Sequence, residues 1–151
     1  MTTRREDGYE IDTALERVDL DAVHRWLSTD AFWALGRSRE TVRRAAEASV
    51  NFGVYDARGA QVGYARVVSD LATFAWLCDV YVVPEQRGLG LGTWLAAAVR
   101  DHLAPYRLQR VLLTTLDAHG VYAKVGFVPF PNPDGLMILQ PPDEPLSAAR
   151  A

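Results

Sequence analysis

The stretch VYVVPEQRGLGLGT, residues 80–93, decides the fold of this chain. It joins an apolar strand to a helix through a turn that carries glycine at alternate positions, Gly88, Gly90 and Gly92. Because these residues lack side chains, a ligand can approach the main chain closely. The helix that follows also directs the positive end of its dipole at the turn. The stretch therefore predicts a binding place for a phosphate or pyrophosphate group.

The spacing of the glycines narrows the choice of phosphate ligand. A dinucleotide-binding fold needs G-x-G-x-x-G, and a P-loop needs G-x-x-x-x-G-K-[ST]. Position 93 is Thr rather than glycine, and no lysine follows the turn. A nucleotide-binding α/β domain thus stays a more distant alternative, which the absence of an acidic ribose ligand also disfavours. What the sequence presents is Arg87-x-x-Gly90-x-Gly92, directly after a strand that ends before Pro84.

Hydrophobic periodicity and turn residues predict an alternating order of strands and helices along the chain. The long apolar run 73–83 indicates a strand in the middle of the sheet. We expect one domain, 1–151, with loose tails at 1–8 and 141–151. The elements predicted between these tails are a strand at 9–15, helices at 19–27 and 39–49, strands at 51–55, 61–68 and 73–83, a helix at 93–103, a strand at 110–116, a helix at 119–125, and strands at 127–130 and 136–139.

Composition excludes several classes of partner. The net charge of −3 gives no electrostatic basis for binding nucleic acid or an anionic membrane surface. We expect a cytoplasmic protein, since no segment is long and apolar enough to span a bilayer and the N-terminus lacks the apolar run of a signal peptide.

Cys78 is the only cysteine, so no intrachain disulfide can form. Its apolar neighbours predict a small buried core residue rather than a catalytic thiol.

A second motif, TLDAHGVYAKVGF at residues 115–127, lies one helix and one strand beyond the glycine turn. Together the two motifs resemble the GCN5-related N-acetyltransferase (GNAT) family, whose members carry [Q/R]-x-x-G-x-[G/A] and then N-x-x-A-x-x-x-Y-x-k-x-G-F. Thr115 stands where the family commonly has asparagine, which changes one side-chain contact to the cofactor. The resemblance covers roughly residues 9–140, and its specific part is confined to 76–130. The second motif is matched by Ala118, Tyr122, Lys124, Gly126 and Phe127.

The resemblance implies an α/β (α+β) fold, the acyl-CoA N-acyltransferase fold. Its central sheet is mixed and mostly antiparallel, with six to seven strands and about four helices on its faces. It implies an N-acetyltransferase that moves an acetyl group from acetyl-CoA to a primary amine of a small molecule or peptide, by direct transfer in a ternary complex and without a metal. Homodimers are common in the family. The alternative is a CoA-binding sensor or interaction module without transfer activity.

The resemblance also assigns the cofactor contacts. In the family, a β-bulge in the strand equivalent to 79–83 separates it from the strand equivalent to 110–116, and the pantetheine arm lies in the gap. Tyr122 is expected beside the cofactor sulfur, where its phenol can protonate the leaving thiolate; the alternative is a core tyrosine. The hydroxyl of Thr115 can still hydrogen-bond. The remaining residues implied are Val80, Tyr81 and Val82 for pantetheine, and Arg87, Gly88, Leu89, Gly90, Leu91, Gly92 and Thr93 for the pyrophosphate.

The sequence defines the binding site of the acceptor amine less closely than that of the cofactor. Asp79 lies in an apolar strand, where a carboxylate is costly unless it is paired or functional. Two interpretations stay open: a general base or binder of a cationic substrate, and an ion pair with an arginine such as Arg66. Phe32 and Trp33 fall where the family builds its acceptor lid, whereas Trp26 fits the inward face of a helix.

Other polar residues are weaker candidates for the acceptor side. His119 has a suitable intrinsic pKa for a base, but it opens a short helix, where a solvated or capping role is commoner. Asp70 and Asp117 fit loop or cap positions. Arg37 and Arg39 can bind a carboxylate substrate, although a solvated surface position is the commoner role for such residues.

Overall fold

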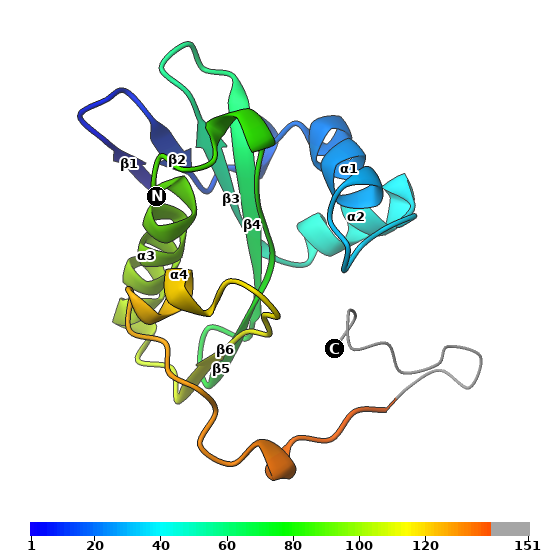
Figure 1. The fold of residues 1–151 in the computed structure, drawn as a ribbon, viewed down its shortest axis with the longest axis vertical. Helices are drawn as coiled ribbons and strands as arrows, with labels where there is room; N and C mark the ends of the chain where they lie inside the picture. Colours follow the sequence, from blue (N-terminus) through cyan, green and yellow to red (C-terminus); the bar gives the residue numbers. More distant parts are fainter. Residues whose placement is uncertain (140–151) are drawn as a thin grey trace.

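The computed structural model describes residues 1–139, which form a six-stranded sheet with helices on both faces (Figure 1). The strands follow the chain in the order β1 to β6, and all neighbours are antiparallel except the parallel pair β5–β6. This confirms the expected mixed, mostly antiparallel sheet. The strands are β1 (Thr2–Arg4), β2 (Glu10–Asp12), β3 (Val50–Tyr55), β4 (Gln61–Ser69), β5 (Phe74–Val82) and β6 (Arg110–Leu112); the helices are α1 (Leu20–Thr29), α2 (Arg39–Glu47), α3 (Leu91–Leu103) and α4 (His119–Ala123).

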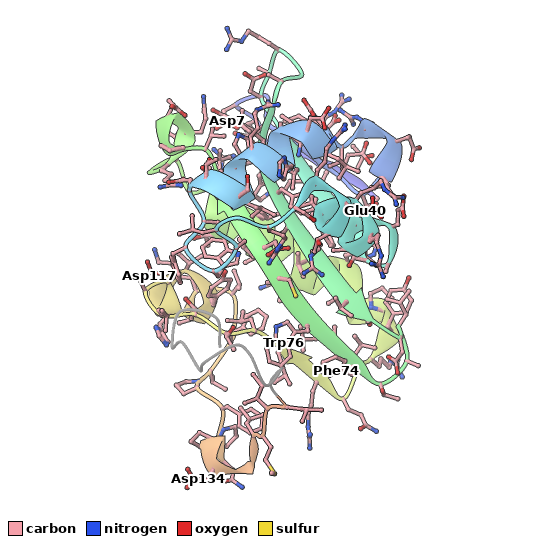
Figure 2. The ribbon with its side chains drawn as sticks, turned by 90° about the vertical axis from the view of Figure 1, so that its right-hand side faces the viewer. Asp7, Glu40, Phe74, Trp76, Asp117 and Asp134 are labelled. Carbon is pink, nitrogen blue, oxygen red and sulfur yellow. The ribbon has the colours of Figure 1, made fainter. Side chains whose placement is uncertain are left out.

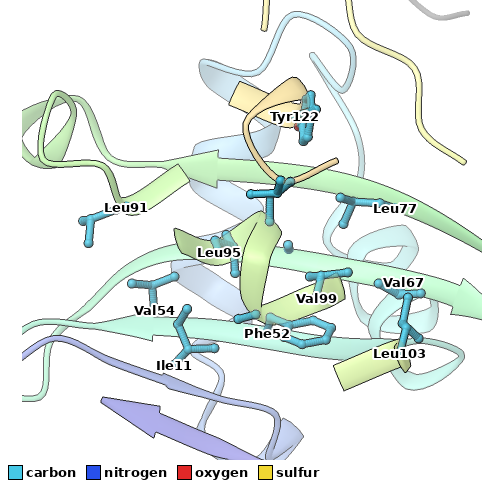
Figure 3. Close-up of a cluster of buried hydrophobic side chains, with 14 of the residues drawn as sticks. Ile11, Phe52, Val54, Val67, Leu77, Leu91, Leu95, Val99, Leu103 and Tyr122 are labelled. Carbon is cyan, nitrogen blue, oxygen red and sulfur yellow. The ribbon is translucent and has the colours of Figure 1, made fainter. Parts of the chain in front are cut away.

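The sheet separates two hydrophobic cores. Helices α3 and α4 cover one face and α1 and α2 the other (Figure 1). On the α3 face, Leu95 and Val99 are fully buried against the sheet, beside Phe52 (Figure 3). On the α1 face, Val23 and Leu27 pack in a smaller cluster with side chains of β4 and β5. The site described below lies where β5 borders both cores.

Both helices of the smaller layer begin at side-chain caps. The carboxylate of Asp19 accepts a hydrogen bond from the Ala22 N–H, and the Ser38 hydroxyl accepts one from the Thr41 N–H. Each cap satisfies one of the N–H groups that a helix start leaves without a partner. These caps confirm the helix starts expected at 19 and 39, and they fix the loop between the helices, which reaches the site.

The structure corrects the expected ends of the chain. Residues 2–4, expected to be loose, form β1 and pair with β2. The strands expected at 127–130 and 136–139 do not form, and β6 ends at Leu112 rather than at 116. Pro129, Pro131 and Pro133 remove main-chain donors that a strand needs. The tail expected at 141–151 lies outside the described residues. Among residues 1–139, no helix has the length and apolar character needed to cross a bilayer.

We predict that Leu95→Ala lowers the free energy of unfolding by about 2–5 kcal/mol, because Leu95 is completely buried between α3 and the sheet. Urea unfolding followed by circular dichroism measures the change. Leu35→Ala is the matched control, since Leu35 is 54% exposed and its truncation should cost no more than about 0.5 kcal/mol. A loss below 1 kcal/mol at Leu95 would show that α3 does not anchor this core.

Candidate active site

The parallel strands β5 and β6, the last two in the strand order of the sheet, separate along their length. Their parallel pairing joins Phe74 to Arg110, Ala75 to Val111 and Trp76 to Leu112, and then ends. Beyond Trp76, the edge of β5 that faces β6 has no strand partner among residues 1–139. A cleft of about 900 Å³ opens there, lined by β5, the glycine turn and the segment from Thr114 to Lys124. Figure 2 labels Trp76 on β5 and Asp117 beside α4, which both line this cleft.

A β-bulge in β5 lies in the wall of the cleft. Tyr64 of β4 pairs with Tyr81, but Arg66 pairs with Cys78, so two residues of β5 face the single residue Ala65. The first of them, Asp79, has φ +52°, in the left-handed region. An extra residue of this kind bends a strand and redirects its side chains. The bulge expected from the family resemblance is thus present at the start of the expected segment.

The bulge changes which face of the sheet the β5 side chains occupy. Leu77, before it, packs in the α3 core, whereas Tyr81, four residues later, packs in the α1 core. Without an extra residue these two side chains would share a face, since side chains alternate along a strand. Cys78 and Asp79 are consecutive, yet both line the cleft.

Cys78 is half-buried and borders the cleft, which corrects the expectation of a buried core residue. Burial raises the pKa of its thiol, so the thiol stays protonated at neutral pH. Because the thiolate is the reactive form, this environment disfavours Cys78 as a nucleophile.

Asp79 is buried and bound on both carboxyl oxygens. Its Oδ1 accepts a hydrogen bond from Trp33 Nε1 at 3.1 Å. Its Oδ2 accepts from Arg66 Nε at 2.6 Å and from Arg37 Nη1 at 2.7 Å. Burial alone would raise the pKa of this carboxyl, but the two guanidinium groups outweigh it and hold the pKa below its ordinary value. The ion pair with Arg66 that the sequence left open is present, and a carboxylate held in this way is a weak proton acceptor.

The glycine turn leaves its main chain open to a ligand. Gly88 and Gly90 have φ of +81° and +75°, and a Cβ at either position would touch nothing within 4 Å. Gly90 precedes α3 without a side-chain cap, so the first N–H groups of the helix lack a side-chain acceptor. These groups and the helix dipole favour an anion at this end of the cleft.

All but one of the turn residues predicted to hold the pyrophosphate line the cleft, but they face it with different groups. The Leu91 side chain is buried in the α3 core, so its main chain is the part available to a ligand. Leu89 is half exposed and does not line the cleft; its carbonyl oxygen accepts a hydrogen bond from Arg5. The Arg87 guanidinium turns back to β5, where it donates to the carbonyl of Val82 and to Asp30. Arg87, Gly88, Gly90, Leu91, Gly92 and Thr93 line the cleft.

The β5 residues predicted to bind pantetheine also line the cleft. The side chains of Val80 and Val82 pack against the α3 core. The Tyr81 ring lies in the α1 core, stacked on Trp26, and its hydroxyl donates to Asp30. Because these side chains are occupied, the main-chain edge of β5 is what remains for a ligand in the cleft.

Tyr122 belongs both to the α3 core and to the wall of the cleft. Its ring is buried in the α3 core and contacts Phe127 edge to face. It also lines the cleft, and its hydroxyl has no hydrogen-bond partner among residues 1–139. Burial, and to a smaller degree the charge of Asp117, raises the pKa of the phenol to about 12. Tyr122 is therefore a neutral phenol at physiological pH, able to donate a proton into the cleft.

The residue in place of the family asparagine supports α4. The Thr115 hydroxyl oxygen accepts a hydrogen bond from the Ala118 N–H at 3.0 Å, immediately before the helix. Its own O–H remains available as a donor, and Thr115 lines the cleft. His119 does not line the cleft, whereas Asp117 does. Asp70 binds main-chain N–H groups of its own turn, so it is a turn residue.

Two aromatic residues of the loop between α1 and α2 form another part of the cleft wall. Phe32 and Trp33 lie edge to face and both line the cleft, close to Asp79. Arg37, a candidate carboxylate binder for which a solvated surface position was the commoner role, lines the cleft. The sequence indicated the contact between Arg37 and Asp79 only indirectly. A buried carboxylate needs a cation, but Arg37 lies 42 residues from Asp79 in sequence. Arg39, in contrast, pairs with Asp21 on the surface.

Comparison with known proteins agrees with this geometry. The sequence profile described as the acetyltransferase (GNAT) family matches residues 20–127. A protein of Gibberella zeae with an acetyltransferase assignment is 29% identical over 148 residues, which span 85% of this chain and 84% of that protein.

Solved structures show the same fold. A crystal structure from Xanthomonas campestris pv. campestris, of a protein assigned to the GNAT acetyltransferases, has a TM-score of 0.83 and 41% identity, and the match covers 93% of this chain and 96% of that one. Rv2747 of Mycobacterium tuberculosis, crystallised with CoA, has a TM-score of 0.65 and 21% identity over 78% of this chain and 70% of its own. The profile and the similarity to the Xanthomonas protein extend over most of this chain, which therefore belongs to the GNAT family of acetyltransferases.

Proposed function

We propose that this protein transfers an acetyl group from acetyl-CoA directly to a primary amine of a small molecule or peptide, within a ternary complex. The observation that carries the proposal is the cleft between β5 and β6. It has an open glycine turn, suited to an anion, at one end and the free phenol of Tyr122 in its wall. The unpaired edge of β5 between them suits the amide-bearing pantetheine arm.

Residues of the chain fit each part of acetyl-CoA. The pyrophosphate would bind the N–H groups of Gly88 to Thr93 at the start of α3. The pantetheine would pair with main-chain groups of Val80 to Val82, and Thr115 would offer its hydroxyl as a donor. The thioester would then lie near Tyr122 and the bulge.

The reaction follows from this placement. The acceptor nitrogen attacks the thioester carbonyl carbon, the new C–N bond forms, and the C–S bond of the tetrahedral intermediate breaks. Tyr122 gives its phenolic proton to the departing sulfur, which leaves as the CoA thiol. The acetylated nitrogen loses its extra proton to water, and the phenolate regains one from solvent. Water takes this role because both carboxyl oxygens of Asp79 are occupied.

For the donor site, we predict opposite effects of Gly92→Asp on stability and on binding. Gly92 is the second residue of α3, and a Cβ there comes no closer than 4.0 Å to Val121. A carboxylate in the first turn should stabilise the helix by about 0.3–1 kcal/mol. The same charge should repel the pyrophosphate and weaken CoA binding by on the order of 10- to 100-fold.

Thermal unfolding with and without CoA or acetyl-CoA measures both effects, because a ligand stabilises in proportion to its affinity. Gly92→Asn is the control, with the same size and no charge. Equal CoA affinity of the Asp and Asn variants would place the phosphates elsewhere. No response of the wild-type protein to CoA or acetyl-CoA, or a response to NAD alone, would exclude the proposed donor.

For the chemical step, we predict that Tyr122→Phe lowers kcat by about 10²–10⁴-fold, because the leaving thiolate loses its proton donor. The affinity for CoA should change little, since the ring and its core contacts remain. Steady-state assays with an amine panel and calorimetry with CoA separate the two effects. Because the pKa of the phenol is raised to about 12, the wild-type protein should keep this donor protonated up to pH 10. An unchanged kcat across pH would show that Tyr122 is not the acid, and CoA binding without transfer to any amine would favour a sensor.

A further inference from the structure

The acceptor end of the cleft holds more positive than negative charge. Arg37 and Arg66 both pair with the single carboxylate of Asp79, through the same oxygen, Oδ2. Among residues 1–139, neither arginine makes an ion pair with any other acidic group. The cluster of these three side chains, the Asp79 cluster, therefore has a formal charge of +1.

This excess charge is largely removed from water. The Asp79 side chain is 4% exposed, and those of Arg66 and Arg37 are 15% and 21% exposed. A partly buried cation without a matching anion is costly to the folded protein, and a bound anion relieves that cost. One arginine would be enough to neutralise Asp79 if the ion pair served only to attach the loop to the sheet. The Asp79 cluster is thus suited to a negatively charged group.

Both guanidinium groups keep donors for such a group. Arg37 uses Nη1 on Asp79, and Arg66 uses Nε on Asp79 and Nη1 on the Ser49 hydroxyl at 3.4 Å. A guanidinium has five N–H donors in a planar fork that matches a carboxylate. Both arginines line the cleft, so their remaining donors lie at its wall.

The cluster is close to the place of reaction. Asp79 directly precedes Val80 in β5, and the bulge turns its side chain to the α1 face of the sheet. Successive strand residues are about 3.3 Å apart, so the cluster lies within a few residues' length of the main chain proposed to hold the thioester. Consider an acceptor whose amino group reaches the thioester while its acidic group reaches Arg37. Its amino and acidic groups must lie a short distance apart.

We propose that the acceptor is an amino acid or similarly short amino acid derivative, whose carboxylate is bound by Arg37 and Arg66 while its amino group faces the thioester. Trp33 and Phe32 form the adjacent wall and suit an apolar side chain or carbon skeleton. A polyamine would bring further cations to a cluster that already has an excess of one. This inference rests on the acetyl transfer proposed above.

The test compares the common amino acids, β-alanine and γ-aminobutyrate with their carboxamides as acceptors of acetyl from acetyl-CoA. For at least one pair, kcat/KM of the wild-type protein should be higher for the acid by about tenfold or more, because the neutral amide leaves the arginine donors without an anion. Arg37→Met should move this ratio toward one, and Arg37→Lys should restore part of it. In Arg37→Met, Asp79 keeps its ion pair with Arg66, and CoA binding checks that the variant is folded.

Arg39→Met is the matched control, because Arg39 pairs with Asp21 on the surface and should leave the ratio unchanged. Amides that react as well as their acids throughout the panel would overturn the inference while leaving the transfer activity in place. So would a preference for acids that Arg37→Met does not alter. If neither series is acetylated although another primary amine is, the inference is overturned and the proposed transfer stands. If no amine is acetylated, the proposed transfer fails, and binding of the N-acetylated acids to the CoA complex decides the inference. Binding that is no tighter than that of the N-acetylated amides would then overturn it.

Discussion

The extra residue in β5 is the constraint on which the site depends. Without it, Leu77 and Tyr81 would share a face of the sheet, and Asp79 would not lie beside the loop that follows α1. The bulge lies beyond the last β5–β6 pair, so the open edge of β5 and the redirected side chains border the same cleft. The bulge thus shapes both the part of the cleft proposed for acetyl-CoA and the part proposed for the acceptor amine.

The conformation of Asp79 has a cost that its partners offset. A non-glycine residue at φ +52° is strained, and burial of a carboxylate adds to the cost. Two arginines and the Trp33 indole compensate by binding both carboxyl oxygens. Because Trp33 and Arg37 belong to the loop between α1 and α2, this set also attaches the acceptor wall to the sheet. The Asp79 cluster therefore supports the site in two ways, through its shape and through its excess positive charge.

Local sequence patterns were sufficient for much of the fold. The glycine spacing predicted the turn before α3, the caps Asp19 and Ser38 predicted two helix starts, and the motif ending at Phe127 led to Tyr122. Cys78 was misjudged because the apolar run 73–83 indicated burial on both faces of the strand, whereas Cys78, on the face opposite Leu77, borders the cleft. The last two predicted strands failed because an apolar run needs a neighbouring strand as well as β propensity. The pairing of Arg37 with Asp79 could not be predicted from the sequence, since the two residues lie 42 positions apart.

The most direct test of the account is a crystal structure of the protein with CoA bound. The account predicts the pyrophosphate on the main-chain N–H groups of Gly88 to Thr93, and the pantetheine along the free edge of β5 from Val80 to Val82. The sulfur should lie within hydrogen-bonding reach of the Tyr122 hydroxyl, and the Asp79 cluster should remain uncovered beside it. Pantetheine outside the β5–β6 cleft, or a sulfur remote from Tyr122, would contradict it.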